Sequence, residues 1–201
     1  MKKIALFLSA VLLLTLLVGC SAAPDEAFIL ESVTSLVEAS YEVNDIFFGE
    51  GLPAIARDSD FAIENYVYYM DYYDNYDYLT ADCPYTHTDQ IKALAETVYS
   101  EDYLSSIYET MFVGLADETA GMLYARYLDT EEGLRKSNIH SPMIEKKRVY
   151  DYSTMTIVKP TNGRFINVEI DTHLEGEADI LRIRLTLVRE DDGWRLDTPT
   201  Y

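Results

Sequence analysis

The C-terminal segment 148–201 alternates apolar and polar side chains with a period of two, most clearly where Ile166, Val168 and Ile170 alternate with polar residues. Such alternation places one row of side chains on a buried face and the other row on the opposite face, as in antiparallel strands. Turn-forming residues separate the alternating runs at 160–163, 175–177 and 191–193. We therefore predict four consecutive strands in a meander, which gives the upstream helices a sheet to pack against.

The N-terminus has the pattern of a secretion signal. Lys2 and Lys3 precede a predominantly apolar run of about 15 residues, which is too short to be a good membrane span. The run ends in Leu17-Val18-Gly19-Cys20, which resembles the lipobox of bacterial lipoproteins. That resemblance implies cleavage after Gly19 and a diacylglycerol group on the thiol of Cys20. The alternative is an ordinary secretory signal that happens to carry a cysteine.

This interpretation divides the chain into three parts. Residues 1–19 are a lipoprotein signal peptide, residues 20–24 are the lipidated cysteine with a short tether, and residues 25–201 form a single domain. The protein is then expected at the cell membrane, on its extracytoplasmic face, with the membrane as a partner through the Cys20 lipid. At about 3.3 Å per extended residue, the domain should lie within roughly 15 to 20 Å of its anchor.

The chain is strongly acidic, with 16 Lys and Arg against 35 Asp and Glu. Loss of Lys2 and Lys3 with the signal peptide leaves 14 basic residues against 35 acidic ones, a net charge of −21. This charge argues against nucleic acid and against anionic lipid as partners. A solvated acidic surface is the simplest account, and cationic partners or bound divalent ions are the alternatives.

The sequence before the meander mixes helices and strands. A helix is predicted from Asp25 to about Phe48, because apolar residues recur near the 3.6 period and glycines follow. The tyrosine-rich segment 61–79 predicts a hairpin that turns near Asp74-Asn75, since tyrosine favours strands.

Two helices should follow in tandem. Thr86 and Asp89 form a loose capping box for the first, while Ser100 caps the second and Gly114 ends it. We expect another strand at 122–128 and a loop at 129–143. The predicted fold class is therefore α+β, with one antiparallel sheet of about six strands packed on about three helices.

This order of elements resembles the NTF2-like cone fold, in which a curved sheet wraps around helices. The closing segment Gly193-Trp194-Arg195-Leu196-Asp197 is similar to the terminal strand of many secreted NTF2-like domains. A weaker resemblance, through the tyrosine-rich strands, the segment 88–112 and the Gly-Trp-Arg ending, is to the secreted DL-endopeptidase inhibitor family. That second resemblance implies control of cell-wall hydrolases by occlusion of their active site.

Glu169, Asp171 and His173 lie at alternate positions of one predicted strand and so project from the same face. Asp171 beside His173 can orient an imidazole for general base catalysis, and the NTF2-like resemblance implies a cavity for such groups. The opposite face carries Ile166, Val168 and Ile170 and is the better candidate for the core. Solvent exposure of the polar row is therefore the preferred interpretation.

Two other clusters invite a chemical interpretation. Cys83 and His87 are four residues apart, which suggests a thiolate–imidazole pair, but a small buried thiol is far more frequent. The carboxylates and amide around the proposed hairpin turn could bind calcium, but their spacing does not fit an EF-hand loop; they are Asp71, Asp74, Asn75 and Asp77. The three histidines show no zinc spacing, and we predict no metal and no cofactor.

Tyrosine is unusually frequent, with 17 in the chain and seven between residues 66 and 78. Tyrosine combines apolar area with a polar tip, which suits contact with a protein or a glycan. The candidate partner-binding residues are Tyr66, Tyr68, Tyr69, Tyr72 and Tyr73. Lys146, Lys147 and Arg148 form a basic run that could meet the phosphates of a wall polymer or could simply begin a solvated strand.

These observations favour a lipid-anchored, extracytoplasmic binding or interaction module of the bacterial cell envelope that performs no catalysis. Two alternatives stay open. One is an inhibitor of cell-wall hydrolases, and the other is an NTF2-like enzyme that uses Asp171 and His173 in a cavity.

Overall fold

The computed structural model describes residues 25–56, 59, 75–117, 121–159, 161 and 163–201. Within them the fold is mixed α+β, with three α-helices and separate antiparallel sheets. Some sequence-predicted sites lie outside the described residues: Cys20 of the lipobox, all five candidate binding tyrosines (Tyr66, Tyr68, Tyr69, Tyr72, Tyr73), and Asp71 and Asp74 of the acidic turn.

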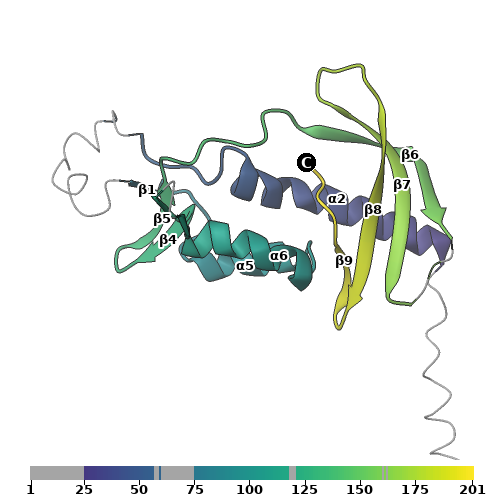
Figure 1. Cartoon of the computed structure of the whole chain (residues 1–201), viewed down its shortest axis with the longest axis horizontal. Coiled ribbons are helices and arrows are strands. Elements are labelled where there is room, and N and C mark those ends of the chain that lie inside the picture. The colour runs from purple at the N-terminus through teal and green to yellow at the C-terminus, as the bar shows by residue number, and fades with distance from the viewer. Residues whose placement is uncertain (1–24, 57–58, 60–74, 118–120, 160, 162) are drawn as a thin grey trace, which may run out of the picture.

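Helix α2, Glu26–Phe48, extends from the C-terminal sheet toward α5 and α6 (Figure 1). It contributes to both hydrophobic cores of the domain. Its first half packs Ile29, Val33 and Val37 against the C-terminal sheet, in what we call the sheet cluster. Its second half contributes Val43, Ile46, Phe47 and Phe48 to a second group, the helix cluster. The predicted helix is confirmed, and Gly49 follows its last residue.

The C-terminal meander has the predicted order β6-β7-β8-β9, with every neighbouring pair antiparallel. Its strands are β6 (Arg148–Val158), β7 (Phe165–Leu174), β8 (Leu181–Glu190) and β9 (Gly193–Leu196). Ile166, Val168 and Ile170 are at most 1 % exposed and pack beneath α2, which confirms the buried face. A register shift between Asp151 and Thr156 marks a bulge in edge strand β6.

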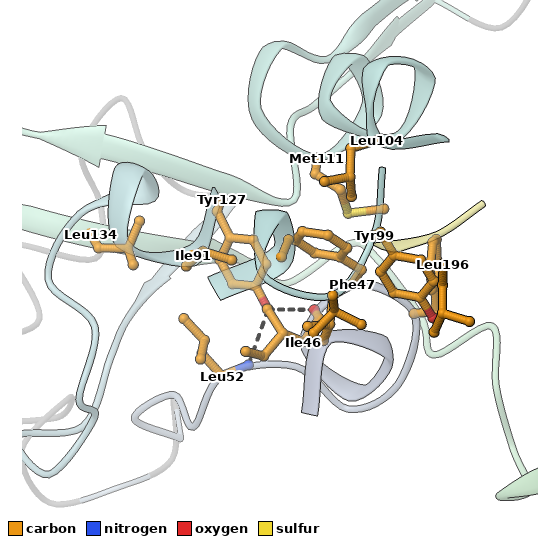
Figure 2. Packing of buried hydrophobic residues seen from close by; sticks show 14 residues of the cluster. Ile46, Phe47, Leu52, Ile91, Tyr99, Leu104, Met111, Tyr127, Leu134 and Leu196 are labelled. Carbon is orange, nitrogen blue, oxygen red and sulfur yellow. Dashed lines mark hydrogen bonds between the residues drawn. The ribbon is translucent and has the colours of Figure 1, made fainter. Parts of the chain in front are cut away.

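The tandem helices are α5 (Thr88–Glu96) and α6 (Glu101–Tyr108), and a π-helical turn η2 (Glu109–Val113) extends α6 to Gly114. The Ser100 hydroxyl accepts the Tyr103 N–H at 3.1 Å, as expected of an N-cap. The capping box of α5 is one residue later than predicted, because His87 is the N-cap and the Gln90 side chain accepts its N–H. Side chains of all these helices meet in the helix cluster (Figure 2).

The remaining strands differ from the single six-stranded sheet that we predicted. Strands β1 (Tyr76–Tyr78), β5 (Gly133–Ser137) and β4 (Tyr127–Thr130) form one sheet in that order, and β2 (Leu115–Asp117) pairs with β3 (Gly121–Leu123). The loop predicted at 129–143 was therefore wrong, since it contains β5. The partner of β1 among the described strands is β5, while the other arm of the predicted 61–79 hairpin lies mostly outside the described residues.

The strand predicted at 122–128 is interrupted because two consecutive side chains, Arg126 and Tyr127, both reach the C-terminal end of α2. The Arg126 guanidinium donates to the carbonyls of Ile46 and Gly49, at 3.0 and 2.5 Å, and the Tyr127 hydroxyl donates to Ile46 O at 2.7 Å. Successive residues of a regular strand point to opposite faces, so the chain must leave the strand geometry here. A cation at these carbonyls also suits the negative end of the helix dipole.

The Tyr127 hydroxyl additionally accepts the Leu52 N–H at 3.1 Å, so it joins the end of α2 to the segment that follows (Figure 2). Gly51 passes close above this hydroxyl with φ of 75°. A Cβ at that position would lie 2.6 Å from Tyr127 Oη, so only glycine fits.

Replacement of Tyr127 by Phe should lower the free energy of unfolding by about 1–3 kcal/mol, because it leaves a buried N–H without its acceptor. Chemical denaturation of the two proteins measures the change. Tyr152→Phe is the matched control, since that hydroxyl donates to the exposed Glu38 carboxylate and its loss should have a smaller effect. An equal loss in both variants would contradict the structural role of Tyr127.

Candidate functional site

A half-open cleft of about 710 Å³ lies at the C-terminal end of α2, and we call it the α2 cleft. Tyr41, Asn44 and Asp45 of the helix form one side, most of the segment 141–148 forms another, and Thr200 and Tyr201 close it. Its volume falls within the range of about 300–1,000 Å³ that is usual for small-molecule sites.

A buried polar network fixes the wall of the α2 cleft where the two hydrophobic clusters meet. The Thr200 hydroxyl lies 2.7 Å from Ser40 Oγ and 2.6 Å from Tyr99 Oη, and it accepts an N–H of Asn44 at 2.8 Å. The Tyr150 hydroxyl donates to Thr200 O at 2.8 Å. Because each of these buried groups has a partner, the network holds the chain end in one position on α2.

The basic run Lys146–Arg148 borders this cleft, a position that the sequence did not predict. Lys146 pairs with Glu177 at 2.6 Å. The ammonium group of Lys147 instead lies 3.7 Å from the centre of the Tyr41 ring, a cation–π contact. The Tyr41 hydroxyl donates to Arg148 O at 2.9 Å, and burial raises the pKa of that phenol.

Arg148 is the unusual member of the run. Its Nη1 atom is buried and has no hydrogen-bond partner among the described residues. A buried donor without an acceptor costs about 1–3 kcal/mol, so such atoms are uncommon in folded proteins. The positive charge also acts on Tyr150, whose pKa is nevertheless raised because burial of the phenol has the larger effect.

The predicted polar row of β7 lies on the face of the sheet opposite the sheet cluster, half-buried rather than fully exposed. Arg182 donates to Asp171 at 2.6 Å and Arg184 donates to Glu169 at 2.7 Å. The hydrogen bond from Arg184 holds the pKa of Glu169 below its usual value. Asp171 thus pairs with an arginine of the next strand. It does not orient the imidazole of His173, so the predicted Asp171–His173 pair is not formed.

The Cys83–His87 pair is also not assembled. Cys83 is half-buried against the helix cluster and its thiol donates to Tyr85 O at 3.6 Å, whereas His87 caps α5 and lies 3.7 Å from Asp129. Of the acidic turn, Asp77 accepts an N–H of Asn138 at 3.0 Å. In the part of the chain that the structure describes, no three His, Cys, Asp or Glu side chains are arranged to hold a metal ion.

Sequence reasoning missed the α2 cleft because residues far apart in the chain build it. One signal was present: Ser40 and Asn44 continue the buried stripe of Val33 and Val37 at helical spacing. Polar residues on the buried stripe of a helix need partners, which here come from Tyr99 and the C-terminal segment.

No protein-family model matches this chain, and none of the curated proteins matches it either. None of the described helices is both long and apolar enough to cross a membrane.

Proposed function

We propose that this protein is a lipid-anchored, extracytoplasmic binding module of the bacterial cell envelope, without catalysis, and that its ligand occupies the α2 cleft. The observation that carries the proposal is the cleft itself, a site of ligand size whose wall is fixed by the Thr200 network. Its lining, all of it in described residues, includes no histidine and no cysteine. This composition favours binding over nucleophilic chemistry.

The arrangement of α2 supports a cleft that is presented away from the bilayer. The helix begins at Glu26, only a few residues after the lipobox cysteine, so its N-terminal end lies near the proposed anchor. Tyr41 lies 15 residues further along the helix, which corresponds to about 22 Å at 1.5 Å per residue. The cleft would therefore open toward the cell envelope beyond the membrane surface.

We also propose that the domain is related to the NTF2-like cone fold. The order of a long helix, paired helices and a closing antiparallel meander supports it. The division of the strands among separate sheets makes any such relationship a distant one.

The anchor is tested by replacement of Cys20 with Ala in a bacterial host. The wild-type chain should remain in the membrane fraction and incorporate a labelled fatty acid, and the variant should lose both properties. Cys83→Ala is the control, because the half-buried Cys83 should not affect lipid attachment. Unchanged membrane association and labelling of the Cys20 variant would contradict the anchor.

The cleft is tested with Ser141→Trp, which fills it without a change of charge, since Ser141 is exposed and lines it. The detergent-purified full chain should co-sediment with purified cell-wall material, and the tryptophan should weaken this binding about tenfold or more. Ser153→Trp, on the exposed bulge of β6, should bind as the wild type does. Absent sedimentation of the wild type, or equal binding of all three proteins, would overturn the proposed function.

A further inference from the structure

We propose that the α2 cleft binds an organic anion, a molecule that carries a carboxylate or a phosphate group, through Arg148 and Lys147. The inference rests on the proposed function, because it concerns the same cleft. It goes beyond that function by assigning the charge of the ligand and the side chains that hold it.

The first argument is that these two cations lack the carboxylate partners that other basic residues have. Several described surface cations face a carboxylate, including Lys92, Lys146, Lys159, Arg182, Arg184 and Arg195. Among the described residues, Lys147 instead contacts an aromatic ring, and Arg148 Nη1 has no acceptor. In a chain of formal net charge −19, adjacent uncompensated cations make a local positive potential that attracts anions.

The acids that line the cleft act on other cations. Asp45 accepts the Glu50 N–H at 3.2 Å, and both carboxylates act electrostatically on Lys136. Glu145 acts on Lys146, which is already paired with Glu177. Among the described residues, Lys147 and Arg148 are the cations of the lining that have no carboxylate within ion-pair distance, whereas Lys146 is paired.

The second argument is geometric, because the backbone of Arg148 is fixed before any ligand arrives. Tyr41 holds its carbonyl, and the residue begins β6 in register with Leu174. A guanidinium donates two parallel N–H groups, which match two oxygens of a carboxylate or a phosphate. Nη1 is shielded from solvent, so the flexible stem of Arg148 must rotate to present it.

The size of the cleft suits an organic ligand. A volume of about 710 Å³ exceeds what a single inorganic anion fills, so uncharged parts of the ligand would contact the rest of the lining. Ser141 and Tyr201 supply polar and aromatic surface for those parts.

The test titrates the full chain, purified in a non-ionic detergent, with two anions and their neutral counterparts. Glycerol phosphate is compared with glycerol, and N-acetyl-alanyl-alanine with its amide; calorimetry and the arginine side-chain signals in NMR spectra report binding. At least one anion should bind more tightly than its neutral counterpart. Binding of glycerol phosphate would identify the anionic group as phosphate, and binding of N-acetyl-alanyl-alanine would identify it as carboxylate. Arg148→Met should weaken that binding about tenfold or more, by loss of charge-assisted hydrogen bonds.

Arg184→Met is the matched control, because it removes the same charge from the outer face of the sheet and should leave anion affinity unchanged. If Arg148→Met fails to fold, Lys147→Met is a second variant at an exposed position, and its anion affinity should fall several-fold. Equal affinity for anions and neutral counterparts, no binding of either anion, or equal losses in Arg148→Met and Arg184→Met would overturn the proposal.

The two proposals fail in different ways. If Ser141→Trp weakens wall binding and Arg148→Met does not, the anion assignment is wrong while the binding function stands. If Ser141→Trp has no effect on wall binding, the proposed function itself is wrong.

Discussion

One apolar stripe of helix α2 serves two hydrophobic cores, and the rest of the domain is arranged around that constraint. Val33 and Val37 face the meander, whereas Val43 and Phe47 face α5 and α6. Burial of each core depends on the same 23-residue helix, so neither part can lose its packing without exposing part of α2. Arg126 and Tyr127 secure the far end of the helix, and these hydrogen bonds satisfy the buried guanidinium of Arg126.

The α2 cleft follows from the same constraint. Between the two cores the helix presents Ser40 and Asn44, whose polar side chains cannot join either cluster without hydrogen-bond partners. Thr200 and Tyr99 provide them, and the chain end that they fix forms one wall of the cleft. The segment that leads into β6 forms another wall and brings Lys147 and Arg148 to it. The candidate site is therefore located at the polar junction of the two cores.

The elements with strong local patterns could be predicted from the sequence. Strand β7 was clear because Ile166, Val168 and Ile170 alternate, and α6 because Ser100 and Gly114 mark its ends. Strand β5 could not be predicted, since burial of its charged Arg135 depends on packing against the distant Tyr78 ring as well as on an ion pair with the neighbouring Glu132. The cleft could not be predicted for the same reason. The basic run was visible in the sequence, but its position beside Tyr41 depends on tertiary packing.

Because both cores pack on α2, we expect them to unfold as one cooperative unit. Native-state hydrogen exchange of Ile170→Ala tests it, because this change removes about 2–5 kcal/mol from the sheet cluster alone. The slowest amides of the helix cluster, such as those of Ile91 and Leu104, should lose the same free energy of protection as those of β7. Loss of protection in the sheet, with unchanged exchange at Ile91 and Leu104, would contradict it.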